Sequence, residues 1–320
     1  MKILFFLMSF VGLSSSFSYA GTLQPKQLLE EMCAAMSSQS YRGTFVHLHN
    51  NKIESMEIVR RKDDSGEVEK LLSLNGEARE IIRKKDVVTC ILPKSQKVTI
   101  DKSRPGSQLP LALPQDLKNI EVFYSLSLDG EERIADNDSL IVSLKPKDSY
   151  RYGHRIWVDK ATKLMVKSDL LDEQGVPIEQ IMFTKLVLDD NLPDSAFKPS
   201  LNAEGFKQVE VGKDRMPPQV ESALKWRLTQ APQGFVLVSH TRQMAKSSQA
   251  PVEHMVLSDG MASVSVFIEP LKGKPLNGAS RMGAVNAYGS VKGDFKVVVV
   301  GEVPAATVML INQHVEALKL

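Results

Sequence analysis

Histidine and cysteine are the side chains of this sequence with the broadest chemistry, and two of the histidines lie close together. His47 and His49 are separated by one residue in a segment that alternates between two faces, so both imidazoles are expected on one face of a strand. Two imidazoles placed in this way can bind a metal ion. A third ligand is not evident, and we interpret the pair as part of an ordinary polar strand face. The sequence therefore predicts neither a metal nor a cofactor.

The same residue types form no recognisable catalytic motif. The sequence has no H-E-x-x-H, G-x-S-x-G, P-loop, EF-hand or G-x-G-x-x-G pattern. A Cys–His nucleophile pair needs a reactive thiol, yet Cys33 and Cys90 both lie in apolar patterns. We therefore predict no catalytic residues and a protein that is not an enzyme.

The two cysteines leave a second question open, which is whether they pair. Cys33 belongs to the apolar stripe of a helical pattern, and Cys90 alternates with Val88 and Leu92 along a strand pattern. A disulfide is chemically allowed in an oxidising compartment. Two buried free thiols are the alternative, because free cysteine is often buried.

The first 20 residues have the layout of a cleaved secretory signal peptide. Lys2 is followed by an apolar run over 3–13, a stretch rich in serine, and Ser-Tyr-Ala at 18–20. We predict cleavage after Ala20 and export of the mature chain, residues 21–320. A retained membrane anchor is the alternative, but the apolar run is shorter than the ~20 residues that a span needs.

Composition and charge further restrict the class of protein to which the chain can belong. The chain has 320 residues, of which 42% are hydrophobic and 24% charged, as in ordinary globular proteins. Its 40 Lys and Arg against 38 Asp and Glu give a net charge of +2, with no basic excess of the kind that nucleic-acid binding requires. The length predicts two domains.

The elements that must position these residues follow from hydrophobic periodicity. Residues 24–39 predict an amphipathic helix. Roughly ten strand-like segments with short turns follow before residue 190, interrupted by an excursion over 103–114 and a predicted helix over 115–126. Sequential pairing through short turns predicts an α+β domain built on one large, curved antiparallel sheet, with helices covering its concave face.

The second part of the chain predicts a smaller α+β domain. Proline and glycine punctuate residues 191–218, and we interpret most of this stretch as a linker between domains. A second set of strand patterns and a closing helix over 304–314 follow. The predicted organisation is a signal peptide at 1–20, a large domain at 21–198, a linker at 199–218 and a C-terminal domain at 219–320.

A set of short segments, in order along the mature chain, has a spacing typical of one known family. In the first domain they are GTFV at 43–46, LSLNGE at 72–77, VTCILP at 88–93, RYGHRIWVD at 151–159 and SDLLD at 168–172. In the second they are APQGF at 231–235, VEHM at 252–255, SDG at 258–260, ASVSVFI at 262–268, GAVNAYG at 283–289 and VGEVP at 300–304. Together they resemble the RseB/MucB family of periplasmic negative regulators of the envelope-stress sigma factor, sigma-E (AlgU-type).

The resemblance implies both a fold and a function. The large domain would be like the lipoprotein carriers LolA and LolB, with a half-barrel sheet around helices and an apolar cleft. The protein would bind the periplasmic region of a membrane-spanning anti-sigma factor similar to RseA or MucA and shield it from regulated proteolysis. Lipid or lipopolysaccharide, or unfolded outer-membrane protein, would release the shield. A homo-oligomer is compatible with this function. The alternative is a periplasmic lipid or lipoprotein carrier, although such carriers lack the C-terminal domain.

Candidate site residues follow from this picture. In the small domain, Phe235 and Tyr288 would supply aromatic contacts to the partner, and Arg242 and Arg281 would pair with its acidic groups. Taken singly, Phe235 follows a turn and is more often a core residue, and Arg242 is more often a solvated one. The predicted cleft residues are Val46, Leu48, Val88, Cys90, Leu92, Met32 and Met36. The two methionines can instead be core, and the sequence does not tell which strand faces line the cleft.

Overall fold

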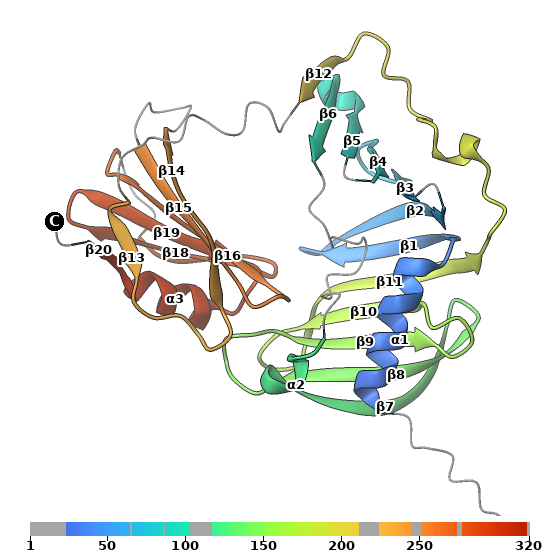
Figure 1. Ribbon diagram of the computed structural model, residues 1–320, viewed down its shortest axis with the longest axis horizontal. Helices are drawn as coiled ribbons and strands as arrows, with labels where there is room; N and C mark the ends of the chain where they lie inside the picture. The colour runs from blue at the N-terminus through green and yellow to red at the C-terminus, as the bar shows by residue number, and fades with distance from the viewer. Residues whose placement is uncertain are drawn as a thin grey trace, which may run out of the picture.

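The computed structural model describes residues 24–64, 66–85, 87–102, 117–210, 224–244, 251–273 and 277–318. Within them the chain forms two sheets, each with its own hydrophobic core, and we call these units the large and the small domain (Figure 1). The predicted signal peptide, its cleavage site and the excursion over 103–114 lie outside the described residues.

The large domain is a curved sheet of twelve strands in the order β12-β6-β5-β4-β3-β2-β1-β11-β10-β9-β8-β7. Its strands are β1 (Tyr41–His49), β2 (Lys52–Asp63), β3 (Gly66–Ser73), β4 (Glu80–Lys84), β5 (Val87–Leu92), β6 (Lys97–Lys102), β7 (Tyr124–Ile134), β8 (Asn137–Pro146), β9 (Gly153–Asp159), β10 (Met165–Leu171), β11 (Pro177–Leu188) and β12 (Lys207–Glu210). The predicted curved sheet is confirmed. It consists of two antiparallel meanders that meet where β11 pairs with β1, and the parallel edge strand β12 makes it a mixed sheet.

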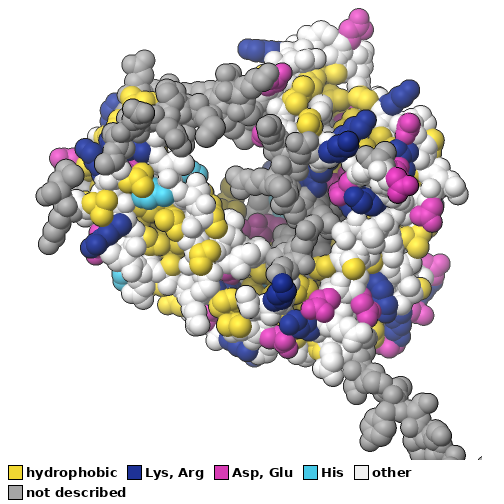
Figure 2. All heavy atoms as spheres, viewed as in Figure 1, with side chains coloured by type: hydrophobic (Ala, Val, Ile, Leu, Met, Phe, Trp, Pro, Cys, Tyr) yellow, Lys and Arg dark blue, Asp and Glu magenta, His cyan; other side chains and the backbone are white. Residues whose placement is uncertain are grey.

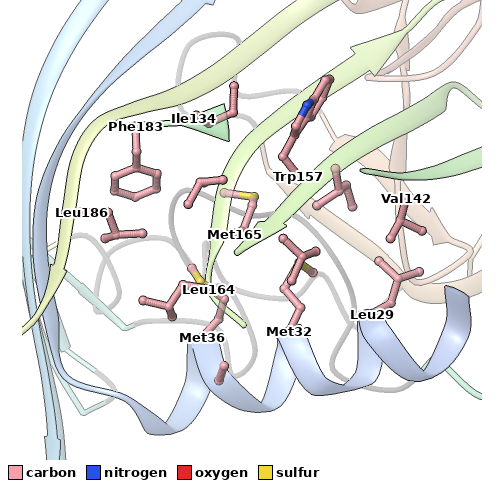
Figure 3. Close-up of a cluster of buried hydrophobic side chains, with 14 of the residues drawn as sticks. Leu29, Met32, Met36, Ile134, Val142, Trp157, Leu164, Met165, Phe183 and Leu186 are labelled. Carbon is pink, nitrogen blue, oxygen red and sulfur yellow. The ribbon is translucent and has the colours of Figure 1, made fainter. Parts of the chain in front are cut away.

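Helix α1 (Pro25–Ser38) covers part of the concave face of this sheet (Figure 1). Pro25 occupies its first turn, where a missing N–H costs nothing. Its apolar stripe packs against side chains from β7 to β11, including Val142, Trp157, Met165 and Phe183 (Figure 3). Burial of this stripe is the main reason why the helix is stable on the sheet.

The helix predicted over 115–126 is largely wrong. Only α2 (Ile120–Phe123) is helical among the described residues of this stretch, and β7 begins at Tyr124. From Tyr124 onward the residues alternate between the core and solvent, with Leu126 packed against the core and Ser125 and Ser127 exposed. This period of two suits a strand and outweighs the local helical pattern.

The chain leaves the large domain along its convex face. The 3-10 turn η2 (Asp194–Phe197) packs Phe197 with Leu192 and Val59. The buried carboxylate of Glu80 then accepts hydrogen bonds from the backbone N–H groups of Ser200 and Leu201. A second 3-10 turn, η1 (Pro93–Ser95), connects β5 to β6. The described start of the predicted linker is therefore fastened to the sheet, and it ends in β12.

The small domain contains a six-stranded antiparallel sheet in the order β14-β15-β16-β19-β18-β17. Helix α3 (Ala305–Gln313) packs on it, and a two-stranded sheet, β13 with β20, flanks it. The strands are β13 (Trp226–Leu228), β14 (Val236–Met244), β15 (Pro251–Ser258), β16 (Ser263–Pro270), β17 (Gly278–Met282), β18 (Val285–Lys292), β19 (Phe295–Gly301) and β20 (Val315–Ala317). None of the helices among the described residues combines the length and the apolar character that crossing a membrane requires.

Candidate functional sites at the domain contact, the concave face and an edge strand

The loop between β8 and β9 joins the two domains through one buried arginine. The Nε of Arg151 donates to Oδ2 of Asp259 in the small domain at 2.8 Å, and both side chains are almost fully buried. Its other nitrogens donate to the Asp148 carboxylate and to the Gln233 carbonyl. Desolvated, hydrogen-bonded charge pairs of this kind are sensitive to the loss of either partner. Arg151 is therefore the centre of the domain contact.

Aromatic rings enclose the Arg151 guanidinium from both domains. The guanidinium carbon lies 4.3 Å from the ring centre of Phe123 and 5.2 Å from that of Phe235. Close approach of the chains requires Gly234, which has φ +89°, because a Cβ there would overlap the Phe123 ring. Cation–π contacts with desolvated guanidinium groups add to the ion pair.

The residues on either side of Arg151 extend the contact. The Tyr152 hydroxyl donates to the Ala284 carbonyl at 3.0 Å and accepts from Nδ2 of Asn286 at 2.9 Å. The Thr307 hydroxyl of α3 donates to the Tyr150 carbonyl at 2.8 Å. Three consecutive residues of one loop thus bind four segments of the small domain. Such a contact can fix the domain arrangement.

The concave face of the large domain has a covered and an open part. Met32 and Met36 lie on the buried face of α1 with 0% and 2% of their surface exposed, so they fill the core and do not line an open cleft as predicted. The open part is formed by β3 to β6. There Val88, Cys90 and Leu92 share the face of Ile81, which pairs with Cys90 and packs against the core, and all three are partly exposed.

Val46 and Leu48 do not belong to this face. On β1 the core residue Phe45 points toward α1, so its neighbours at even positions point to the convex side. The prediction that Val46 and Leu48 line the cleft is therefore wrong. Two alternating faces are visible in the sequence, but only the packing of α1 shows which of them is concave.

A pocket of about 920 Å³ lies at the open end of the concave face. Leu92 lines it together with charged side chains, among which are Glu54, Arg79 and Lys94. Its wall thus combines an apolar surface with both signs of charge. This lining suits a ligand that has an apolar part and a charged group.

The four predicted partner-binding residues do not form one site. Phe235 is buried at the domain contact, so in this arrangement its ring cannot reach a partner. Arg242 faces Glu253 of its own domain, with Nε 3.8 Å from the carboxylate. Tyr288 packs partly buried against the small core, and Arg281 is exposed on β17 and donates to the Gly283 carbonyl.

A surface that the sequence analysis missed lies on β14. Among the described residues this strand pairs with β15 alone, so it is an edge of the small sheet. Val236, Leu237 and Val238 are 60%, 49% and 56% exposed at its start. Three consecutive exposed apolar residues on an edge strand are uncommon and indicate a place where another chain can bind. The apolar run 235–238 was visible in the sequence, but it reads equally well as a buried strand.

Cys33 and Cys90 are both free thiols in the structure, so the disulfide that the sequence left open is not formed. Burial, together with the charge of Glu30, raises the pKa of the Cys33 thiol to about 11. Only the thiolate reacts with disulfide reagents. At pH 8 we therefore expect Cys33 to react at least about tenfold more slowly than an ordinary thiol.

This expectation can be checked with Ellman's reagent. The unfolded, unreduced chain should release two equivalents of thionitrobenzoate, and the folded Cys90→Ser variant should release its single equivalent slowly, faster as the pH rises toward 10. Fewer than two equivalents from the unfolded chain would indicate a disulfide instead.

The large curved sheet and the smaller second sheet, each with its own core, define the class as a two-domain α+β protein. The chain belongs to the MucB/RseB family: the MucB/RseB N-terminal domain matches residues 24–201, and the MucB/RseB C-terminal domain matches residues 220–316. The resemblance seen in the sequence is thereby confirmed.

Individual relatives agree over nearly the full length. The chain is 32% identical to the Pseudomonas aeruginosa protein "Sigma factor AlgU regulatory protein MucB", over 87% of this chain and 86% of that protein. It is 27% identical to "Sigma-E factor regulatory protein RseB" of Escherichia coli K12, over 99% and 98% of the two chains.

Solved structures of MucB are also similar. MucB in complex with MucA(peri) has a TM-score of 0.73 at 26% identity, over 93% of this chain and 100% of that one. The Pseudomonas aeruginosa MucA/MucB complex has a TM-score of 0.74 at 27% identity, over 92% and 99% of the two chains. For MucB alone the TM-score is 0.60 at 26% identity, over 92% and 98%.

Proposed function

We propose that this protein binds the periplasmic region of a membrane-spanning anti-sigma factor, shields it from regulated proteolysis, and releases it when a lipid such as lipopolysaccharide binds. The observation that carries the proposal is the likeness, over both domains, to MucB bound to MucA(peri). The protein acts after export to the periplasm, following removal of residues 1–20. It works by binding and not by catalysis.

The arrangement of the two domains supports this proposal. Coverage and identity are nearly the same for MucB alone and for MucB with MucA(peri), but the TM-score is higher for the complex, 0.73 against 0.60. The domain contact around Arg151 therefore belongs to an arrangement closer to that of the partner-bound relative. A ligand that favours another arrangement would lower the affinity for the partner by its differential affinity for the two states.

The edge of β14 is the surface we propose for the anti-sigma segment. An extended segment can add to an unpaired strand edge through backbone hydrogen bonds, while apolar side chains provide specificity. Val236, Leu237 and Val238 supply such side chains. Figure 2 shows hydrophobic side chains gathered on the small domain. The open part of the concave face, with Val88, Cys90 and Leu92, is the proposed lipid site.

The test is calorimetric titration of residues 21–320 with the periplasmic segment of the anti-sigma factor of the same cell, with and without lipopolysaccharide. We expect binding that weakens when the lipid is present. The Val236→Glu/Val238→Glu double variant should lose at least about tenfold in affinity for the segment, because charged side chains on an edge strand oppose strand addition.

Val176→Glu is the matched control for this double variant. Val176 is also an exposed apolar residue, 55% exposed, but it lies in the turn before β11 of the large domain. Its substitution should leave the affinity unchanged. No binding of the segment under either condition would contradict the proposed function. If the double variant and the control lose affinity for the segment equally, the interface does not lie on β14.

The pocket at the open end of the concave face favours a second candidate, a lipid or lipoprotein carrier. Under that function, lipid would co-purify with the mature chain and the anti-sigma segment would not bind. The same titration therefore separates the two functions, provided that lipid extracted from the purified protein is analysed alongside.

A further inference from the structure

His47, His49 and Glu54 come together on the hairpin formed by β1 and β2. The two histidines alternate on one face of β1, and Glu54 lies directly opposite His47 in the register of β2. The imidazole rings stack with their centres 4.5 Å apart. One potential ligand atom from each of the three residues lies within 4.8 Å of the other two. Glu54 on the paired strand β2 is thus the third potential ligand, which is not evident from the sequence alone.

The chemistry of these three groups is that of a transition-metal site. Two imidazole nitrogens and one carboxylate oxygen form a ligand set that zinc commonly takes, with bonds of about 2.0–2.2 Å and the fourth position left to water or another oxygen. Ligand atoms on one tetrahedral zinc lie roughly 3.4 Å apart. Nε2 of His49 is already 3.4 Å from Oε1 of Glu54. Small side-chain rotations are therefore sufficient to close the set around an ion.

Neighbouring groups support the ligands in this role. Arg79 donates to the other carboxylate oxygen of Glu54 at 3.1 Å, which leaves Oε1 toward His49. Although burial raises the pKa of Glu54, Arg79 and His49 hold it below its ordinary value, so the carboxylate is ionised at neutral pH. Oε2 of Glu179 on β11 lies 3.6 Å from Nε2 of His47. Carboxylates next to a metal-binding histidine orient its ring or complete the ligand set.

We propose that His47, His49 and Glu54 form a binding site for a divalent transition-metal ion, zinc or a metal of similar ligand preference, with Glu179 as the supporting carboxylate. The site lies beside the small domain. Asn50, next to His49, contacts Gly283 so closely that a Cβ at Gly283 would overlap the Asn50 side chain.

Local charge also favours a cation at this position. Glu302 of the small domain faces the same group, and its pKa is raised by partial desolvation and by the negative charge of Glu179, while His47 lowers it. Glu54 and Glu179 contact the two histidines, and Glu302 interacts electrostatically with His47; the cations beside them are Arg79, which pairs with Glu54, and Lys52, which lies opposite His49 in the register. A bound divalent ion would reduce the repulsion among these carboxylates, across the contact between the domains.

The test uses the mature chain, residues 21–320, prepared without a histidine tag and titrated with zinc chloride against a chromophoric chelator at pH 7.5. We expect one zinc ion per chain. His49→Gln and Glu54→Gln should each weaken binding by more than about tenfold, and Glu179→Gln by about 10–100-fold, the range found for supporting carboxylates.

His314→Gln is the matched control, because it removes one imidazole at the end of α3, outside this group. It should bind zinc as the unchanged chain does. Visible absorption of the cobalt-substituted protein adds an independent readout, since a tetrahedral site with these ligands gives intense bands that the His49→Gln variant should lose. The proposal is overturned if zinc does not bind, or if His314→Gln and His49→Gln weaken binding equally. Both results are independent of anti-sigma factor binding.

Discussion

Replacing Arg151 with alanine should destabilise the protein by about 3–5 kcal/mol and uncouple its two domains. The substitution leaves the Asp259 carboxylate buried at the domain contact without its charged partner, and breaking one side of a buried ion pair typically costs this much. It also removes the hydrogen bond to the Gln233 carbonyl and the contacts with the rings of Phe123 and Phe235. Oδ1 of Asp259 keeps its backbone donors from Met261 and Ala262, so the local turn survives.

The measurement is urea unfolding followed by tryptophan fluorescence. The chain has two tryptophans, Trp157 in the large domain and Trp226 in the small one. Single Trp→Phe backgrounds therefore report on each domain separately. We expect the two transitions to coincide with Arg151 present and to separate in Arg151→Ala, with the less stable domain unfolding first.

Arg133→Ala is the control for this experiment. Arg133 pairs with Asp136 at an exposed position in the β7–β8 turn, and exposed pairs contribute at most about 1 kcal/mol. Arg151→Lys keeps the charge and loses the forked geometry, so its stability should lie between those of the alanine variant and the unchanged chain. Equal stability of Arg151→Ala and Arg133→Ala would show that the domain contact does not depend on this arginine.

The domain contact was not predictable from the sequence, although some of its residues belong to segments that carry the family resemblance. The segment 151–159 contributed to the family resemblance, but nothing in its pattern says that Arg151 is buried between two domains. Arginine is usually exposed, and burial of one depends on partners that are distant in the sequence, here Asp259 and Gln233. Pattern analysis reports the local environment, and this contact is entirely long-range.

The sheets were predictable because their signals are local. Alternation of polar and apolar residues and short turns placed most strands of both domains close to where they lie. The strands β17 and β20 were missed, since Gly278–Met282 is mostly exposed and Val315–Ala317 is only three residues long. The order of the large sheet, with β11 beside β1, is set by burial against α1 and by closure of the sheet, and neither has a local signature.

The candidate sites show the same difference between local features, which the sequence predicts, and long-range contacts, which it does not. Val88, Cys90 and Leu92 were predicted on the cleft and share the concave face, whereas Val46 and Leu48 were assigned to the wrong side of β1. The sequence placed His47 and His49 on one strand face but favoured an ordinary polar face over a metal site, because Glu54 becomes their neighbour only through the hairpin register. Residues that share a strand can be grouped from sequence, and residues on different strands need the register.

Replacing Glu253 with alanine should destabilise the small domain by about 3–5 kcal/mol. This buried carboxylate accepts hydrogen bonds from the backbone N–H groups of Lys225 and Trp226 at 2.8 and 3.2 Å, and thereby fastens β13 to β15. Nε2 of His240 lies 3.2 Å from it and Nε of Arg242 lies 3.8 Å from it. Its removal leaves the N–H groups of Lys225 and Trp226 without this acceptor, and an unsatisfied buried donor is costly.

Urea unfolding followed by Trp226 fluorescence in a Trp157→Phe background measures this loss in the domain concerned. Glu269→Ala is the matched control, because Glu269 pairs with Lys296 in the same sheet at a partly exposed position, and its loss should cost less than about 1 kcal/mol. Glu253→Gln retains one acceptor oxygen and should fall between the two. A loss no larger in Glu253→Ala than in Glu269→Ala would contradict the structural role assigned to this carboxylate.

A separate variant, Arg242→Ala, tests the role of Arg242, which the sequence predicted as a contact for acidic groups of the partner. Nε of Arg242 lies 3.8 Å from the Glu253 carboxylate, so its side chain contributes to the small domain itself. We expect Arg242→Ala to lower the stability of the small domain and to leave the affinity for the anti-sigma segment unchanged at temperatures where the variant is folded. A loss of affinity in the folded Arg242→Ala variant would instead show that Arg242, which lies on β14, contributes to the partner interface.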